Sequence, residues 1–382
     1  MFPVLVRELK QAKKYIFIEY FIINDGVMWQ TILNILEKKA AEGVDVRLIY
    51  DGFGCLTTLP HKYYEELQKK GIKCQVFNPF RPILNIIQNN RDHRKLCIID
   101  GWVGFTGGIN LADEYINQKE RFGHWKDTAV MIQGEAVKSF TLLFLKMWHV
   151  AKGKDSIPQE EIRKYTVEVW ENTQSDEMRT DMESMRNTDM QNTQDKKLHA
   201  GGYVIPYGDD PYGDERIGKQ VYIDILNRAR KYVHIMTPYL ILDNEMIDAL
   251  TRAAKGGIEV QIIMPHIPDK PYAFYLAKTY YEELIAGGVE IYEYTPGFVH
   301  AKVFTSDDDT ATVGSINLDY RSLYLHFECG VFIYRNPVVR DIEKDFQETL
   351  AKCQKVTMTE VRNRSTFVKI YGQVLRIVAP LM

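Results

Sequence analysis

Hydrophobic and polar positions along the chain follow two alternating periods, and the alternation occurs twice. Val4–Lys14 and Val221–Lys231 repeat apolar residues at the spacing of an amphipathic helix. Each is followed by a continuous apolar run, Tyr15–Ile23 and Tyr232–Leu240, which predicts a buried strand. Further helices and strands follow in the same order in both parts. Helices that alternate with buried strands predict an α/β fold built from βαβ units, with a largely parallel and covered sheet.

The correspondence between the two parts extends to the sequence itself. Three segments recur in order at a nearly constant offset: AKKYIFI (12–18) and ARKYVHI (229–235), EGVDVRLI (42–49) and GGIEVQII (256–263), YYEELQKKGIKCQVF (63–77) and YYEELIAGGVEIYEY (280–294). A duplicated unit explains this order better than separate coincidences do. We therefore predict two tandem halves, residues 1–153 and 201–382, that pack about a pseudo-two-fold axis into one bilobal unit.

The stretch between the halves, residues 154–200, has a different composition. From 171 to 197 it holds no aromatic residue and no Ile, Val or Leu. Such a segment buries too little apolar surface to offset its ordering entropy, so it is predicted to be a flexible linker. Its four methionines leave open a second interpretation, a lid over an apolar substrate.

Both halves carry the same polar residues at and after one predicted strand. The first half holds His93, Lys95, Asp100, Gly108 and Asn110, and the second holds His300, Lys302, Asp307, Ser315 and Asn317. The step from histidine to asparagine is 17 positions in both halves. A single histidine on an apolar strand is usually a structural residue, but two such sets in register inside a duplicated unit indicate a shared active site.

Strand geometry assigns these residues to faces. Alternate residues of a strand share a face, so each histidine points the same way as the lysine two positions later. Asp100 and Asp307 lie an odd number of positions further on, and a continuous strand would turn them away as supporting charges. Gly108 and Ser315 permit close approach of the backbone, and Asn110 and Asn317 add amide donors. If the halves meet at these strands, the site holds two histidines, two lysines and two asparagines.

This collection of hydrogen-bond donors suits a tetrahedral phosphate anion better than a metal ion, and it predicts chemistry without a metal or an organic cofactor. One neutral imidazole would attack phosphorus and form a phosphohistidine, and the other would donate a proton to the leaving alkoxide. The sequence does not decide which histidine is the nucleophile. Asp127 and Glu328 each open an apolar run, and we expect them to orient the imidazoles. The alternative is that both are solvated charges at strand ends.

The segments HRKLCIID (93–100) and HAKVFTSD (300–307), followed by GGIN and GSIN, resemble the paired HKD motifs of the phospholipase D superfamily. IFIEYFIINDG, FTGGINLADEY and VGSINLDYRS resemble bacterial cardiolipin synthases more closely. The resemblance implies a phosphatidyltransferase that joins two phosphatidylglycerol molecules into cardiolipin and releases glycerol. It implies that the catalytic residues are those of the two motifs: His93, Lys95, Asp100, His300, Lys302 and Asp307. It also implies that His93 is the nucleophile and His300 the general acid and base.

Charge and composition limit the partners of the protein. Lys and Arg total 48 and Asp and Glu total 51, so a nuclease with a basic groove is disfavoured and no nucleic acid is expected as a partner. The five cysteines contain no CxxC pair and predict reduced thiols in the cytosol. A phospholipase D-type hydrolase, another phosphatidyltransferase and an inactive membrane-binding scaffold remain as alternatives.

The resemblance also implies a location at the cell membrane, with the catalytic part on the cytoplasmic side. No run of about 18 uncharged apolar residues exists in the sequence. We therefore expect attachment to an anionic membrane surface either by the protein itself or by a segment outside these residues. Residues 80–87 (FRPILNII) and 367–382 are the candidate surface segments, and docking onto the protein's own core is the alternative for each.

Overall fold

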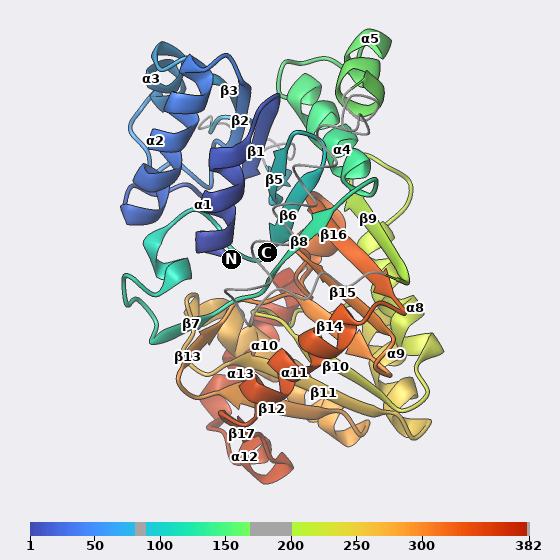
Figure 1. Ribbon diagram of the computed structural model, residues 1–382. Helices are drawn as coiled ribbons and strands as arrows, with labels where there is room; N and C mark the ends of the chain where they lie inside the picture. The colour runs from blue at the N-terminus through green and yellow to red at the C-terminus, as the bar shows by residue number, and fades with distance from the viewer. Residues whose placement is uncertain (81–88, 169–200, 380–382) are drawn as a thin grey trace.

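The computed structural model describes residues 1–80, 89–168 and 201–379. The predicted flexible stretch 171–197 and most of the apolar segment 80–87 lie outside these ranges. None of the five cysteines is paired, in agreement with the expected reduced thiols. The chain forms two halves, one above the other in Figure 1, and each half is built on its own sheet.

The first half contains a six-stranded sheet in the order β3-β2-β1-β5-β6-β8. Its strands are β1 (Tyr15–Tyr20), β2 (Asp45–Asp51), β3 (Lys73–Phe77), β5 (Lys95–Ile99), β6 (Val103–Gly107) and β8 (Ala129–Gln133). The helices α2 (Val27–Ala41) and α3 (Tyr63–Lys69) connect β1, β2 and β3, which are parallel.

The expectation of a largely parallel sheet is wrong for the other side of β1. Strands β5, β6 and β8 each run antiparallel to their neighbour. Only Asp100–Trp102 separate β5 from β6, and so short a connection can join antiparallel strands but cannot make a crossover. The HxK strand therefore begins a meander in the middle of the sheet.

The second sheet repeats this order. Its strands β12-β11-β10-β14-β15-β16 correspond to β3-β2-β1-β5-β6-β8, and β17, β4 and β9 extend it. The bounds are β9 (Tyr203–Asp209), β10 (Tyr232–Met236), β11 (Glu259–Pro265), β12 (Glu290–Tyr294), β14 (Val303–Ser306), β15 (Thr310–Gly314), β16 (His326–Tyr334) and β17 (Cys353–Lys355). The matching order confirms the predicted duplicated α/β unit.

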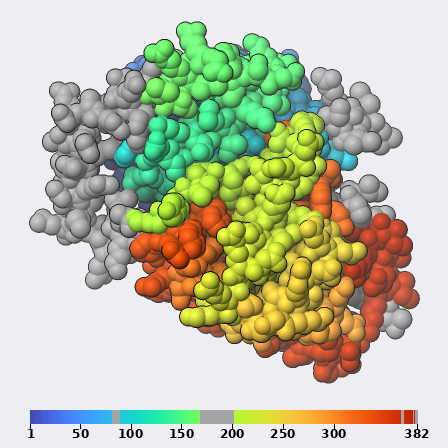
Figure 2. Space-filling view, turned by 90° about the vertical axis from the view of Figure 1, so that its right-hand side faces the viewer, coloured from blue at the N-terminus to red at the C-terminus, as the bar shows by residue number. Residues whose placement is uncertain are grey.

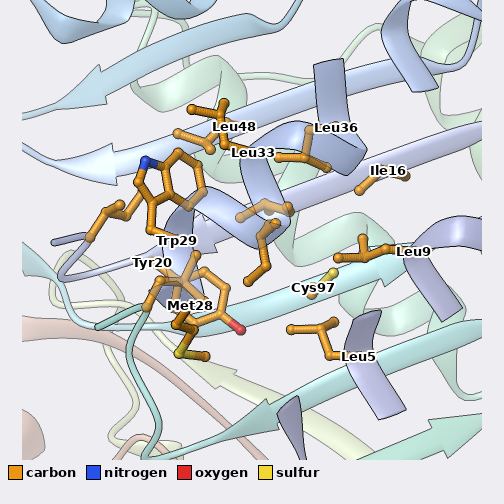
Figure 3. Close-up of a cluster of buried hydrophobic side chains, with 14 of the residues drawn as sticks. Leu5, Leu9, Ile16, Tyr20, Met28, Trp29, Leu33, Leu36, Leu48 and Cys97 are labelled. Atoms are coloured by element: carbon orange, nitrogen blue, oxygen red, sulfur yellow. The ribbon is translucent and has the colours of Figure 1, made fainter. Parts of the chain in front are cut away.

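Helices pack on both faces of the two sheets, with α4 and α11 on the inner faces. The first half carries α1 (Phe2–Gln11), α4 (Val137–Val150) and α5 (Gln159–Ile162), and the second carries α8 (Ile217–Arg228), α9 (Asn244–Lys255), α10 (Pro271–Ala286), α11 (Val338–Leu350), α12 (Met358–Arg362) and α13 (Thr366–Val378). Figure 3 shows one outer core, in which Leu5 and Leu9 of α1 and Trp29 and Leu33 of α2 pack beside Ile16 of β1. This burial fixes the helices against the sheet.

The inner faces of the two sheets share a third core. It joins Phe17 and Leu96 of the first half with Val303 and Val313 of the second, and it includes aromatic side chains of α4 such as Phe144. In Figure 2 the segment that begins the second half lies across the boundary between the halves, where Lys146 of α4 binds Asp210 at 2.6 Å. The halves are therefore one packed body, and the HxK strands lie at its centre.

The described start of the stretch expected to link the halves is packed on the first half. Residues 163–168 continue the helix of α5, and the buried Tyr165 ring lies 5.1 Å from the Tyr15 ring. Among the described residues, no helix has both the length and the apolar character needed to cross a bilayer.

Candidate active site

Two short parallel strand pairs bring each histidine beside the carboxylate of the other half. In one, β4 (Arg91–Asp92) pairs with the start of β16, and the His93 N–H donates to the Phe327 carbonyl at 3.0 Å. In the other, β13 (Gly297–Val299) pairs with β7 (His124–Lys126), and the His300 N–H donates to the Lys126 carbonyl at 2.7 Å. The next residue after each of these carbonyls is a carboxylate: Glu328 follows Phe327, and Asp127 follows Lys126. Each histidine therefore lies beside a carboxylate from the other half.

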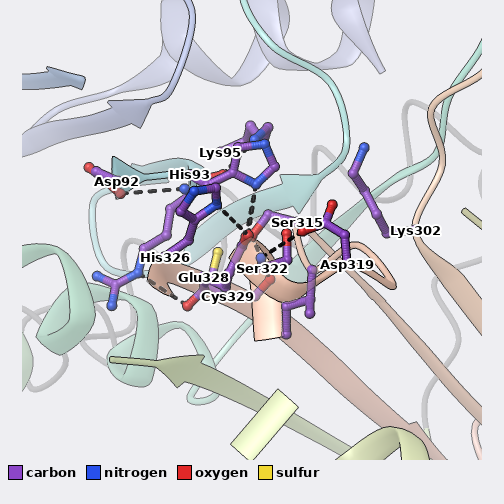
Figure 4. A network of polar contacts seen from close by, with 12 residues as sticks. Asp92, His93, Lys95, Lys302, Ser315, Asp319, Ser322, His326, Glu328 and Cys329 are labelled. Atoms are coloured by element: carbon purple, nitrogen blue, oxygen red, sulfur yellow. Dashed lines mark hydrogen bonds and ion pairs between the residues drawn. The ribbon is translucent and has the colours of Figure 1, made fainter. Parts of the chain in front are cut away.

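The His93 half-site consists of His93, Lys95, Ser315 and Glu328. His93 Nδ1 lies 2.8 Å from Glu328 Oε1, and the second carboxylate oxygen accepts the Ser315 hydroxyl (Figure 4). Lys95 donates through Nζ to the His93 carbonyl oxygen. Both His93 and Glu328 are buried.

The His300 half-site consists of His300, Lys302, Gly108 and Asp127. His300 Nδ1 lies 2.8 Å from Asp127 Oδ2 and 2.9 Å from Lys302 Nζ. A Cβ atom at Gly108 would lie 2.1 Å from Asp127 Oδ1 and 2.6 Å from the His300 carbonyl oxygen, so only glycine fits there. Gly108 thus provides the close backbone approach that its position suggested.

The two half-sites influence each other electrostatically. Burial lowers the pKa of Lys302 to about 7 against the attraction of Asp127, and repulsion from Lys95 contributes to the decrease. Burial lowers the pKa of Lys95 to about 8. The pKa of His300 falls well below its ordinary value because of burial and of both lysine charges. Lys95 is therefore close enough to the His300 half-site to affect its charges.

The two carboxyl groups respond to burial in opposite ways. Burial raises the pKa of Asp127 to about 6, although the Lys302 charge opposes the rise. Burial acts in the same direction on Glu328, but the interactions with His93 and His326 and the Lys95 charge outweigh it and lower its pKa. Burial and the Lys95 charge keep the pKa of His93 well below its ordinary value. The first pair is thus an ionised glutamate that accepts the Nδ1 proton of a neutral imidazole.

The other residues singled out from the sequence make local structural contacts. Asp100 accepts the backbone N–H groups of Lys13, Lys14 and Tyr15 at 2.7–2.8 Å, which ends α1 at Gln11 and not at the predicted Lys14. Asp307 accepts those of residues 230–232 in the same way. The structure thus places both aspartates against backbone, away from the imidazoles.

The two asparagines lie in buried positions beside the site. Asn110 donates its side-chain amide to the Tyr115 hydroxyl at 2.7 Å and accepts the Ile22 N–H at 3.1 Å. The Tyr115 ring in turn lies 5.4 Å from the His300 ring, edge to face. Asn317 is buried, and among the described residues its Oδ1 has no hydrogen-bond partner.

Sequence reasoning missed the residue that stands two positions before each carboxylate. Trp125 lies 5.3 Å from the His300 ring and donates through Nε1 to Asp127 at 3.4 Å. His326 lies 5.4 Å from the His93 ring, with Nδ1 3.6 Å from Glu328 Oε1. Strand alternation carries the signal, because residues two apart share a face. His326, His93 and Glu328 offer ligand atoms that all lie within 4.8 Å of one another.

Comparison with known proteins shows the family of the chain. A family model described as cardiolipin synthase, PLD-like domain matches residues 5–148 and 222–350, one segment in each half. The chain belongs to this family. Cardiolipin synthase 2 of Bacillus anthracis is 36% identical over the whole chain and 68% of that relative. Cardiolipin synthase of Halalkalibacterium halodurans is 34% identical over the whole chain and 70% of that protein.

A third relative, an uncharacterized protein of Streptococcus mutans serotype c, is 50% identical over the whole chain and 76% of its own length. Among solved structures, phosphatidylserine synthase of Haemophilus influenzae Rd KW20 superimposes with a TM-score of 0.71 over the whole chain and 93% of that protein, at 17% identity. At that identity the match shows the fold alone. The predicted membership of the phospholipase D superfamily and the predicted bilobal fold are confirmed.

Proposed function

We propose that this protein is a cardiolipin synthase that transfers a phosphatidyl group from one phosphatidylglycerol to another and releases glycerol. The observation that carries the proposal is the crossed pairing of His93 with Glu328 and of His300 with Asp127, with Lys95 beside His93 and Lys302 beside His300. Two oriented imidazoles beside two ammonium groups suit a phosphodiester that is cleaved in two steps. The family of the chain supports the lipid substrate.

His93 acts as the nucleophile in this proposal. Its Nδ1 proton is held by Glu328, so the lone pair of Nε2 is left for phosphorus. The Nε2–P bond forms while the bond from phosphorus to the glycerol oxygen breaks. The product of this step is a phosphatidylhistidine and a glycerol alkoxide that needs a proton.

His300 supplies that proton through Nε2 and later recovers it. In the second step the free hydroxyl of another phosphatidylglycerol gives its proton to His300 and attacks phosphorus, and the P–N bond breaks. Lys302 and Asp127 both contact the Nδ1 side of His300. Asp127 and Lys302, with pKa values of about 6 and about 7, are suited to exchange a proton with a histidine that must gain and lose one in each cycle. Lys95 and Lys302 stabilise charge on the phosphoryl oxygens.

We propose that α13 holds the protein on an anionic membrane surface. One face of α13 docks on the protein through Leu375, while Ile370, Val374 and Ile377 on the other face are 61%, 55% and 80% exposed. These three are spaced as one stripe of a helix, with Lys369 beside them. The free cysteines support a cytoplasmic location. Changing Ile370 and Ile377 to Ser should weaken co-sedimentation with phosphatidylglycerol vesicles, and Val27→Ser, at an exposed site in the first half, should not.

The test of the reaction is incubation with labelled phosphatidylglycerol vesicles, followed by lipid separation and acid-free trapping of phosphohistidine. Wild-type protein should yield cardiolipin and glycerol. Phosphatidic acid as the main product would indicate hydrolysis, and unchanged lipid would reject an enzymatic function. His93→Ala should give no covalent intermediate, whereas His300→Ala should still label His93 slowly. The exposed His266 is the control position, and His266→Ala should keep full turnover.

A further inference from the structure

His326 is a buried imidazole beside the nucleophile that the proposed reaction does not use. Its side chain is 8% exposed, and neither of its ring nitrogens has a hydrogen-bond partner among the described residues. A buried polar atom without a partner is costly, so a water molecule, a ligand or an ion is expected to bind such a group. Figure 4 shows the rings of His326 and His93 on the same side of Glu328, both turned toward its carboxylate.

We propose that His93, His326 and Glu328 form a zinc site through which Zn²⁺ reversibly inhibits the enzyme. The separations are 2.8 Å between His93 Nδ1 and Glu328 Oε1 and 3.6 Å between His326 Nδ1 and the same oxygen. Bonds of about 2 Å from a tetrahedral ion to each ligand need separations of about 3.3 Å, so small side-chain movements create the site. Two imidazoles and one carboxylate are a ligand set that zinc accepts, with a fourth position open.

The same surroundings exclude the common hard cations. Mg²⁺ and Ca²⁺ bind mainly to oxygen ligands and need six or more of them, and this cluster offers one carboxylate. The Lys95 ammonium also lies near Glu328 and repels a cation held by charge alone. Zinc overcomes this repulsion because imidazole nitrogens bind it strongly. The site should therefore select Zn²⁺ over Mg²⁺ and Ca²⁺.

The other half of the molecule provides an internal contrast. Trp125 occupies the place of His326, and its only ring nitrogen donates to Asp127. An indole nitrogen has no lone pair for a metal. The His300 half-site therefore lacks this ligand set, and one Zn²⁺ per chain is expected, bound at the His93 half-site.

The inhibition follows from which ring nitrogen of His93 carries the proton. It therefore rests on the proposed role of His93 as nucleophile. A metal bound to Nδ1 displaces the proton that Glu328 holds, and a neutral imidazole must then carry its proton on Nε2. The Nε2 lone pair that attacks phosphorus is thereby occupied. The proton lost from Nδ1 is replaced at Nε2 from solvent, so the step needs no further reactant.

Metal binding can be tested without any turnover. We would titrate the full chain with Zn²⁺ by calorimetry and with Co²⁺ by absorption, since tetrahedral Co²⁺ has strong visible bands. One equivalent should bind, and His326→Trp, which copies the other half-site, should weaken binding at least about tenfold. His326→Asn serves if the tryptophan does not fold, and His266→Asn is the control. Equal binding by wild type and both His326 variants, or no saturable binding, would overturn the site.

Inhibition is then measured against each protein's own zinc-free rate. Zn²⁺ should abolish both cardiolipin formation and phosphohistidine trapping, EDTA should restore them, and Mg²⁺ should have no effect. The His326 variants should need at least about ten times more Zn²⁺. Stoichiometric binding at His326 with unaltered phosphohistidine formation would refute the tautomer mechanism. If wild-type protein lacks transferase activity altogether, the Co²⁺ spectra still decide whether the site exists, so the two proposals fail separately.

Discussion

In the His93 half-site the carboxylate belongs to a glutamate with a serine hydroxyl beside it, whereas in the His300 half-site it belongs to an aspartate that faces a glycine. Aspartate is shorter by one methylene group, so the backbone at Gly108 must come closer to it. The longer Glu328 leaves room for the Ser315 side chain, whose hydroxyl supplies a hydrogen bond. The length of the acidic side chain and the size of the residue beside it are therefore matched in each half.

The histidines differ in the contacts of Nδ1. Among the residues that the structure describes, His93 Nδ1 has hydrogen bonds with Glu328 alone, whose two oxygens lie at 2.8 and 3.1 Å, while His300 Nδ1 contacts both Asp127 and Lys302. One nitrogen cannot donate to a carboxylate and accept from an ammonium at the same time, so the proton position at His300 is variable. A fixed tautomer suits a nucleophile and a variable one suits an acid and base. This contrast supports the proposed roles.

The largest effect is expected from exchanging the carboxylates for amides. The Ser315 hydroxyl donates to Glu328, so Glu328→Gln should turn its oxygen toward Ser315 and its NH₂ toward His93. An NH₂ donor moves the His93 proton to Nε2 and should lower kcat about 10³-fold. Asp127→Asn should cost only about 10- to 100-fold, because Lys302 also contacts the His300 nitrogen. Steady-state kinetics on vesicles measure both.

Phosphohistidine trapping sharpens the same comparison. Glu328→Gln should form little intermediate, and Asp127→Asn should accumulate it because its second step is slowed. The reverse pattern would exchange the roles of His93 and His300. Thermal melts by circular dichroism check that both proteins are folded.

The next effect concerns the neighbours of the carboxylates. Gly108→Ser puts a side chain into Asp127 and the His300 backbone, so we expect about a 100-fold loss of turnover together with about 1–3 kcal/mol of stability. Ser315→Gly removes one hydrogen bond to an ionised carboxylate and should cost about tenfold. Kinetics and chemical denaturation of both variants test this. Equal losses at the two positions would show that the half-sites are not specialised.

Much of the fold and the site was predictable because the duplication repeats each sequence motif in both halves. The twin HxK segments with Gly108, Ser315, Asp127 and Glu328 were found by their matching positions, and all except Asp100 and Asp307 lie in or beside the site. Those two aspartates are where the strand pattern and the family resemblance pointed in different directions. The structure places both against the backbone, as the strand pattern suggested.

Two features could not be read from the sequence, and a third, His326, was missed. The exchange of carboxylates between halves depends on β4 and β13, which have only two and three residues and no recognisable pattern. The antiparallel meander after β5 depends on a turn in which Asp100 and Gly101 both have positive φ, and an apolar run does not reveal strand direction. His326 was missed because a histidine before FECGV has no counterpart in the other half, where the residue is tryptophan.

The buried lysine of the His300 half-site should be visible in the pH dependence of stability. The pKa of Lys302 is lowered to about 7 in the fold, against 10.5 in the unfolded chain. The unfolded chain therefore binds more protons between these values, and wild-type stability should rise with pH there. Relative to Lys302→Met, the gain from pH 7 to 9 should be roughly 2 kcal/mol. Denaturant unfolding measures it, and Lys344→Met, at an exposed position, should leave the rise unchanged. Parallel curves for wild type and Lys302→Met would mean that Lys302 stays charged.

The smallest effect concerns Asp100 and Asp307, a pair that makes the same contacts in both halves. Asp100 accepts hydrogen bonds from three backbone N–H groups through its two carboxylate oxygens. In Asp100→Asn the side-chain NH₂ would face the Lys13 N–H, so two donors would meet and one hydrogen bond would be lost. The positive φ at Asp100 is one that asparagine also adopts, so the turn itself should survive. We expect a loss of about 2 kcal/mol for Asp100→Asn and about 1 kcal/mol for the more exposed Asp307→Asn.

Because both carboxylates face backbone and not the imidazoles, turnover of the folded enzyme should change less than about threefold in either variant. Denaturant unfolding gives the stability, and kinetics below the melting temperature give the rate per folded molecule. A folded Asp100→Asn or Asp307→Asn protein with strongly reduced turnover would indicate that these residues take part in catalysis. It would also show that the similarity of the halves at this position is functional, because packing of the turn alone could not transmit such a loss to the imidazoles.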